Sequence, residues 1–156
     1  MYNVRFKLLD YFININENTL KIINEYIQDS NVKPESGGIL LGQLKGHNIY
    51  VQKVTIPNKF DSSTRYTFIR AKEIAQIILD YEVVNSQNTI TYLGEWHTHP
   101  ENTPTPSQQD KRMINEQFKL GTFNVPFLLL LIRGIESIGL FGLKDGKLHQ
   151  AIVITE

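Results

Sequence analysis

Two histidines separated by one residue, His97 and His99, carry the most suggestive chemistry in this sequence. We predict a strand from Ile90 to His99, in which residues two apart lie on the same face. The two Cα atoms would then be roughly 6.5–7 Å apart, so both imidazoles could reach one metal ion. Pro100 ends the predicted strand because proline has no N–H to donate.

A carboxylate, Asp110, follows after a proline-containing loop and a predicted helix start at Ser107. This strand, loop and helix path can bring Asp110 back towards the end of the strand. Two neutral nitrogens and one carboxylate, with a fourth position for water, form the ligand set of a catalytic zinc site. Ser107 and Asp110 also have a structural interpretation, because a serine N-cap with an acid three residues later resembles a capping box.

Two glutamates compete for the role of a general base beside such a metal. Glu95 shares the predicted strand face of the two histidines, whereas Trp96 points to the opposite side. Glu35 precedes Gly37 and Gly38, which permit either a tight backbone path or a close approach of the chain to a site. Strand geometry alone does not separate the two glutamates.

Taken together, an upstream Glu, a His-x-His pair, seven intervening residues and a Ser-x-x-Asp resemble the signature of the JAB/MPN (JAMM) metalloprotease family. The resemblance implies that His97, His99 and Asp110 bind Zn²⁺, that Glu35 is the general base, and that Ser107 stabilises the oxyanion. It implies a curved mixed sheet flanked by helices as the fold. Because every signature residue is present, it implies an active enzyme rather than a catalytically dead scaffold.

The segment from Gly94 to Glu101 is similar to the peptidases of bacterial antiphage (CBASS) operons, a prokaryotic branch of the family. The resemblance implies a zinc-dependent isopeptidase or peptidase acting on a ubiquitin-like or other conjugated protein. A nucleotidyltransferase joined by an E1/E2-like enzyme is the partner that it implies. Two other hypotheses stay open: a peptidase that trims a sulfur-carrier or ubiquitin-like precursor, and a non-catalytic, zinc-stabilised binding module.

Composition sets the outer bounds. At 156 residues we expect one domain, spanning 1–156, and the 16 basic and 16 acidic residues create no global field for nucleic acid or membranes. The absence of cysteine excludes thiolate metal sites, including those of the zinc nucleobase deaminases. No signal-peptide core and no window of membrane-spanning length is found, so we expect a cytoplasmic protein. The oligomeric state stays open.

Periodicity predicts the element order βαββαβαβββ, an α/β or α+β fold with helices packed on a sheet. The predicted strands cover 4–9, 39–42, 49–56, 90–99, 127–132, 138–143 and 148–154. One helix is predicted to start at Asn16 or Asn18 and to end near residue 29, one to span 70–84, and one to start at Ser107. Asp145 and Gly146 predict a hairpin turn between the last two strands.

The polar segment 57–67 is predicted to be a surface loop. Three of its side chains, Phe60, Arg65 and Tyr66, are candidates for contacting a protein substrate, since aromatic residues and arginine dominate interface hot spots.

Overall fold

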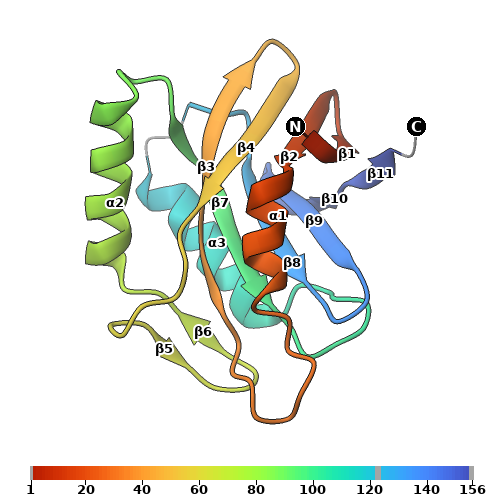
Figure 1. The fold of residues 1–156 in the computed structure, drawn as a ribbon. Helices are drawn as coiled ribbons and strands as arrows, with labels where there is room; N and C mark the ends of the chain where they lie inside the picture. The colour runs from red at the N-terminus through yellow and green to blue at the C-terminus, as the bar shows by residue number, and fades with distance from the viewer. Residues whose placement is uncertain (1, 122–123, 155–156) are drawn as a thin grey trace.

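The computed structural model describes residues 2–121 and 124–154, which form three helices and eleven strands (Figure 1). The helices are α1 (Glu17–Asn24), α2 (Lys72–Asn85) and α3 (Gln108–Leu120). The strands are β1 (Tyr2–Leu8), β2 (Tyr11–Asn16), β3 (Gly37–Lys45), β4 (Asn48–Val54), β5 (Ser62–Ser63), β6 (Phe68–Ile69), β7 (Thr91–Thr98), β8 (Leu128–Arg133), β9 (Ile138–Lys144), β10 (Lys147–Gln150) and β11 (Ile152–Ile154).

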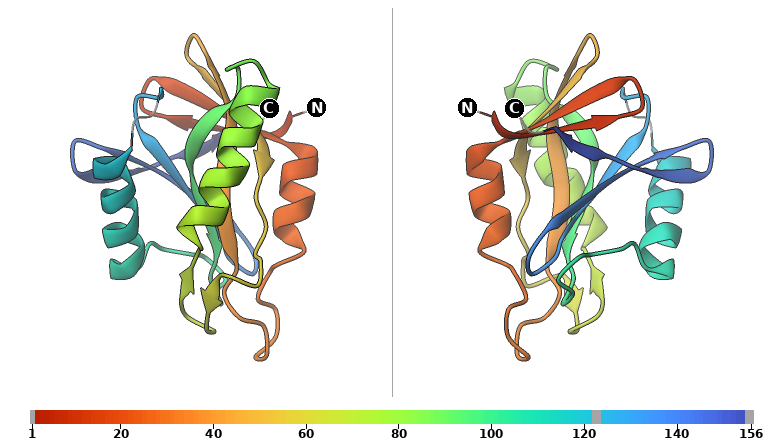
Figure 2. Two further views of the ribbon diagram at one scale, coloured as in Figure 1. Left: turned by 90° about the vertical axis from the view of Figure 1, so that its left-hand side faces the viewer. Right: turned by 90° about the vertical axis from the view of Figure 1, so that its right-hand side faces the viewer.

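Nine of these strands form one curved, mixed sheet in the order β10-β9-β8-β7-β3-β4-β2-β1-β11, and β5 and β6 form a separate small hairpin. The pairs β2–β4 and β7–β8 are parallel and the others are antiparallel. Helices α1 and α3 lie on opposite sides of this sheet (Figure 2). The expected α+β fold, a curved mixed sheet flanked by helices, is therefore confirmed.

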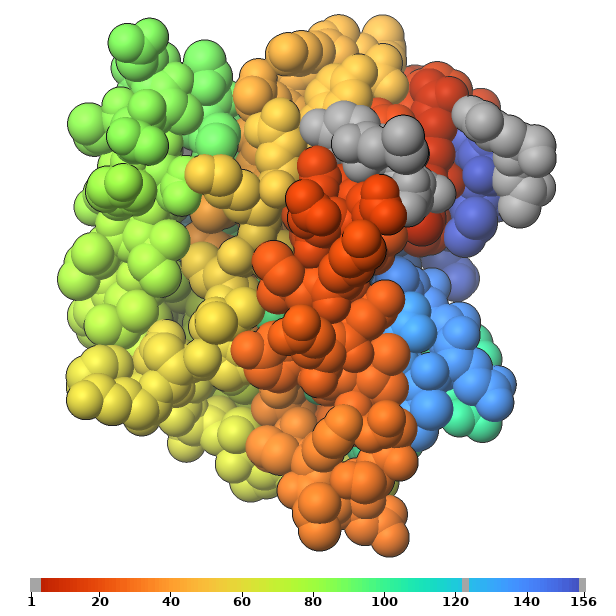
Figure 3. All heavy atoms as spheres, in the orientation of Figure 1, coloured from red at the N-terminus to blue at the C-terminus, as the bar shows by residue number. Residues whose placement is uncertain are grey.

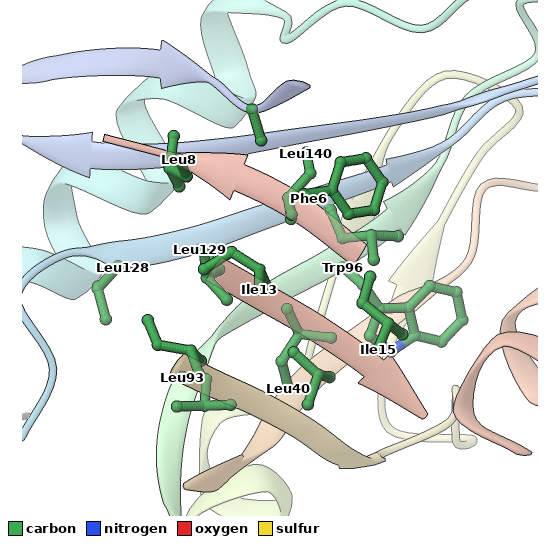
Figure 4. Close-up of a cluster of buried hydrophobic side chains, with 14 of the residues drawn as sticks. Phe6, Leu8, Ile13, Ile15, Leu40, Leu93, Trp96, Leu128, Leu129 and Leu140 are labelled. Atoms are coloured by element: carbon green, nitrogen blue, oxygen red, sulfur yellow. The ribbon is translucent and has the colours of Figure 1, made fainter. Parts of the chain in front are cut away.

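The core lies between the strands and α1, where aromatic and branched aliphatic side chains from distant segments meet (Figure 4). Phe6, Ile13, Trp96 and Leu129 are all within 2% of full burial. Trp96 packs against Tyr26, and its indole N–H donates to the carbonyl of Thr55 at 2.9 Å. Trp96 therefore fills the core on the strand face opposite the histidines, and burial of these side chains supplies most of the driving force for folding.

The N-terminal region contains a strand that the sequence did not predict. Between β1 and α1 the chain forms β2, and β1 and β2 make a hairpin with Leu8 paired to Tyr11. Leu9 occupies the turn with a φ of 53°, a left-handed conformation for which a leucine gives no sequence signal. Asn16 caps α1, as one of the two predicted starts required, but the helix ends at Asn24 rather than near residue 29.

The C-terminal strand is also divided. The predicted strand 148–154 breaks at Ala151, whose amide donates to the carbonyl of Leu140 at 2.8 Å. The residues before the break pair with β9 as β10, and those after it pair with β1 as β11. The hairpin turn at Asp145 and Gly146 is confirmed, with positive φ values of 53° and 74°. The segment predicted as one strand, 148–154, thus provides residues to both edge strands of the sheet, β10 and β11.

Helix α2 packs less deeply than its apolar spacing predicts. Ala75 is its buried residue, whereas the side chains of Ile77 and Tyr81 are each 64% exposed. The helix begins at Lys72, two residues later than predicted, because Ala71 is extended and its amide donates to Asp61 Oδ1 at 2.8 Å. Among the described residues, no helix combines the length and apolar character needed to cross a bilayer.

Candidate metal centre

Strand β7 delivers both histidines to one buried point at its carboxyl end. It is held between β3, where Gly37 pairs with His97, and β8, where Ile132 pairs with His97 on the other side. The amide of His99 donates to the carbonyl of Arg133 at 3.0 Å and extends this pairing past the strand end. The two imidazole rings are nearly parallel, at 11°, and each histidine is only 5% exposed.

Asp110 reaches the same point from the first turn of α3. Its Oδ1 lies 3.3 Å from His97 Nε2, and its Oδ2 lies 3.1 Å from His99 Nε2. The helix starts with a capping box, in which Ser107 Oγ accepts from the Asp110 amide at 3.0 Å and the Ser107 amide donates to Asp110 Oδ2 at 2.8 Å. The structural interpretation of this motif is therefore correct, and the same box aims the carboxylate at the histidines.

Ser107 itself is exposed at the N-cap. Its hydroxyl oxygen acts as an acceptor in the cap, so this bond does not use the hydroxyl proton. The side chain therefore remains able to donate a hydrogen bond beside the cluster formed by the two histidines and Asp110.

Glu35 completes the cluster from the other side of the strand end. Its carboxylate oxygen Oε1 lies 3.9 Å from His99 Nε2, and its side chain is 4% exposed. Ligand atoms of Glu35, His99 and Asp110 all lie within 4.8 Å of one another. The glycine after Ser36 explains the approach, because a Cβ on Gly37 would stand 2.5 Å from the carbonyl oxygen of Trp96.

One nitrogen of each imidazole, Nε2, faces Asp110 and is placed to bind a metal ion. Within the described residues, both ring nitrogens of His97 and the Nδ1 of His99 are buried without a hydrogen-bond partner. An unpaired buried polar atom is unfavourable, and imidazole nitrogens that converge with carboxylates are typical ligands of zinc and similar ions. His99 Nδ1 faces Glu101 Oε1 at 3.3 Å, an outer carboxylate of the kind that orients a ligating imidazole.

Burial and neighbouring charges shift the pKa values of the two histidines and the two carboxylates in different directions. Burial lowers the pKa of His97 to about 4, so its imidazole is neutral at physiological pH. Burial raises the pKa of Glu35 to about 8, against the opposing effect of His99. Burial acts to raise the pKa of Asp110, but the hydrogen bond with His99, the charges of the two histidines and the Ser107 amide together outweigh burial, and the pKa is lowered. Burial acts to lower the pKa of His99, but Asp110, Glu35 and Glu101 together outweigh burial, and the pKa is raised.

The rival carboxylate, Glu95, is engaged elsewhere. It is buried, and it forms an ion pair with Arg70 Nε and accepts a hydrogen bond from the Tyr92 hydroxyl at 2.8 Å. Arg70 in turn donates to Gln117 Oε1 on α3 at 3.1 Å. The carboxylate of Glu95 therefore lies in a paired network next to the cluster, rather than among its converging ligand atoms.

A cleft of about 380 Å³ opens beside His97 and Asp110. Phe68 and Ile69 of β6 form part of its wall, and Met113 of α3 lies among its other lining residues. The Phe68 ring also meets the His97 ring edge-on at 6.3 Å. Sequence reasoning missed Phe68, since no motif marks it and only the folding of β5 and β6 brings it to the cluster.

The three side chains proposed as substrate contacts lie outside this cleft. The segment 57–67 that carries them was predicted to be a surface loop, but it contains the short strand β5, which pairs with β6 just after it. Phe60 and Tyr66 are 63% and 71% exposed. Arg65 Nη1 donates to the carbonyl of Ser30 at 2.8 Å, which ties this segment to the chain that follows α1.

Comparison with known proteins assigns this architecture to a family. The sequence model described as prokaryotic homologs of the JAB domain matches residues 26–140, and the chain therefore belongs to this family. The family resemblance inferred from the sequence is confirmed. In fold, the chain is similar to a protein from Desulfitobacterium hafniense solved in solution, with a TM-score of 0.64, 20% identity and 88% of each chain covered.

Two relatives carry the same name, CD-NTase/cGAS isopeptidase. The protein from Pseudomonas aeruginosa is 36% identical over 103 residues, which are 66% of this chain and 65% of that protein. The protein from Vibrio cholerae is 32% identical over 123 residues, which are 79% of this chain and 76% of that protein. The match thus spans just under two thirds of the Pseudomonas relative's length and about three quarters of the Vibrio relative's length.

Proposed function

We propose that this protein is a zinc-dependent isopeptidase that releases a protein conjugated through its C-terminus. The observation that carries the proposal is the buried group of Glu35, His99 and Asp110, with His97 against Asp110 at the edge of a cleft. The names of the relatives support a deconjugating role. A binding module would have no need for the buried carboxylate of Glu35 next to the imidazole of His99.

In this proposal His97, His99 and Asp110 hold the zinc ion. When bound, zinc lowers the pKa of a coordinated water and polarises a carbonyl. Glu35 takes a proton from the attacking water and delivers it to the leaving amine, since its carboxylate lies at the edge of the cluster. Ser107 donates a hydrogen bond from its hydroxyl group to the developing oxyanion and keeps its proton.

The raised pKa of Glu35 suits this exchange of protons. A carboxyl group whose pKa is near 8 before the metal binds holds a proton readily, and a nearby cation favours its ionised form. A change of protonation state is thus accessible near neutral pH, which a general acid and base requires. The buried Phe68 ring lies edge-on to His97 and forms an apolar part of the cleft wall beside the site.

The substrate in this proposal is a conjugate made by an E1/E2-like enzyme, with a nucleotidyltransferase as its conjugated protein and antiphage defence as the context. The relatives' name, which refers to a CD-NTase, supports this substrate class. A ubiquitin-like protein conjugated to lysine is the alternative substrate of the same reaction.

The test uses the purified full chain and two substrates made with the same nucleotidyltransferase. In one, its C-terminus is joined to a lysine side chain; in the other, it continues as a linear peptide. We expect zinc-loaded protein to cleave the isopeptide, chelator-treated protein to leave it intact, and added zinc to restore cleavage. Cleavage of the linear extension alone would favour precursor trimming. No cleavage by zinc-loaded protein would overturn the enzyme proposal.

A further inference from the structure

The residue between the two histidines, Thr98, faces away from them and is fully buried. Its Oγ1 accepts a hydrogen bond from the Ser36 amide at 2.8 Å and donates one to Gln28 Oε1 at 2.9 Å. Its own amide donates to the carbonyl of Ser36 at 2.9 Å. Thr98 therefore clamps the residue that directly follows Glu35 by both its side chain and its backbone.

Gln28 extends this clamp to a third segment. Its side-chain amide is 1% exposed, and Nε2 donates to the carbonyl of Lys33 at 3.2 Å and to the carbonyl of Arg65 at 2.9 Å. One amide group thus joins β7, the segment after α1, and the segment that forms β5–β6. Figure 3 shows the segment after α1 beside the β5–β6 segment at the lower end of the face that α1 crosses.

Glu35 lies where these connections meet. Its amide donates to the carbonyl of Thr64 at 2.7 Å, and the next amide, that of Ser36, is held by Thr98. The β5–β6 hairpin that provides Thr64 also provides Phe68, which contacts His97. The position of the carboxylate and the position of the cleft wall therefore depend on the same buried hydrogen bonds.

We propose that Thr98 and Gln28 are positioning residues, which set the Glu35 backbone and the β5–β6 wall relative to the two histidines. The catalytic part of this inference rests on the function proposed above. Loss of the Thr98 hydroxyl would leave both the Ser36 amide and the side-chain oxygen Oε1 of Gln28 without that partner. Such a loss is costly in the low-dielectric interior of a protein. A displacement of about 1 Å in a catalytic group lowers turnover by roughly 10²-fold.

The chain offers a matched set of variants for a test. Thr98→Val removes the hydroxyl at nearly constant volume, and Thr98→Ser keeps it. Gln28→Leu removes the bonds to the two carbonyls. Thr19→Val is the control, because Thr19 is 1% exposed and its Oγ1 donates to the carbonyl of Gln52 at 3.1 Å, far along the chain from the cluster.

The first measurement is amide hydrogen exchange, which needs neither metal nor substrate. We expect Thr98→Val and Gln28→Leu to speed exchange at Ser36 and Glu35 by about 10-fold or more relative to amides of β8, such as Leu131. Thr19→Val and Thr98→Ser should not. Equal protection of the Ser36 amide in Thr98→Val and in wild type would overturn the positioning role, whatever the protein cleaves.

The second measurement is steady-state cleavage of the conjugate by zinc-loaded variants. We expect Thr98→Val to lower kcat by about 10–10²-fold with little change in KM and with zinc content unchanged, and Thr98→Ser to recover most of the loss. Thr19→Val should match wild type. Wild-type kcat in Thr98→Val would overturn the catalytic part of the inference. A wild-type protein that cleaves nothing would count against the proposed function, while the exchange measurement still decides the positioning.

Discussion

Strand β7 carries two buried polar clusters side by side, and the clusters differ in how many of their polar atoms have hydrogen-bond partners. Glu95 is paired with Arg70 and accepts from Tyr92, so its carboxylate has its partners within the protein. At the neighbouring cluster, both ring nitrogens of His97 lack a hydrogen-bond partner among the described residues. The two clusters are almost equally buried.

The difference separates a structural role from a ligand-binding one. A buried polar group is stable when its partners are present, and one without partners is disfavoured unless something else binds it. The Glu95 network connects β7, the residues before α2, and α3, because Arg70 also bonds Gln117. In the His97 cluster, by contrast, His97 Nε2 faces Asp110 Oδ1 at 3.3 Å without a hydrogen bond, and both residues line the cleft. The following predictions test this contrast.

The largest effect is expected from removing a ligand. His97→Ala should abolish bound zinc and cleavage together, because it removes a zinc ligand that the Glu95 network cannot replace. Glu95→Gln should keep about one zinc per chain, because Glu95 belongs to the paired network. Metal analysis of the two purified variants measures this. Full zinc occupancy in His97→Ala would contradict the assignment of the metal centre.

The second prediction compares the two glutamates by turnover. Glu35→Gln should retain zinc and lose about 10²–10⁴-fold in kcat, because the group that transfers the proton is gone. Glu95→Gln should lose less than about 10-fold, since its amide oxygen can still accept a hydrogen bond. The exposed Glu136→Gln is a matched control for the substitution itself. A larger loss in Glu95→Gln than in Glu35→Gln would reverse the assignment.

The third prediction concerns stability and the paired cluster. Arg70→Met should destabilise the metal-free protein by about 3 kcal/mol, because it leaves Glu95 buried without its ion-pair partner. Lys53→Met is the control, since it breaks an ion pair with Glu82 in which the lysine is half exposed, and it should cost less than about 1 kcal/mol. Urea denaturation compares them. An equal loss in the free energy of unfolding for both variants would show that the Arg70–Glu95 ion pair is no more important for stability than an exposed one.

The smallest effect is a pH dependence of the metal-free protein. Because the pKa of Glu35 is raised from 4.5 to about 8, the folded state keeps a proton that the unfolded chain releases. Stability should therefore fall by about 1–2 kcal/mol as pH rises from 6.5 to 8, and the raised pKa of His99 acts in the same direction. Glu35→Gln should make this decline shallower in denaturant titrations.

The sign reverses for His97, which limits the useful pH window. Its pKa is lowered to about 4, so below pH 6.5 the unfolded chain takes up a proton that the folded state refuses, and stability falls as pH drops. Between pH 4.5 and 6.5 the effects of Glu35 and His97 therefore oppose each other. A decline above pH 6.5 that persists unchanged in Glu35→Gln would rule out Glu35 as its source.

Local patterns in the sequence determined the parts of this protein that depend on short-range geometry. His97 and His99 share a face because side chains alternate along a strand. Ser107 and Asp110 approach because a helix start places residues three apart together. The buried strand β8 and the turn at residues 145–146 were predictable for the same reason, whereas β2 was missed because its turn begins at a leucine with positive φ.

Tertiary structure decided what spacing along the chain does not encode. Glu35 meets His99 only through the pairing of β3 with β7, and Gln28 meets Thr98 across 70 residues of sequence. The register of β7 shifts between Tyr92 and Gly94, and this bulge lets Tyr92 reach Glu95, three residues later, although strict alternation would place them on opposite faces. Such contacts depend on sheet register and long-range packing, which a single sequence does not specify locally.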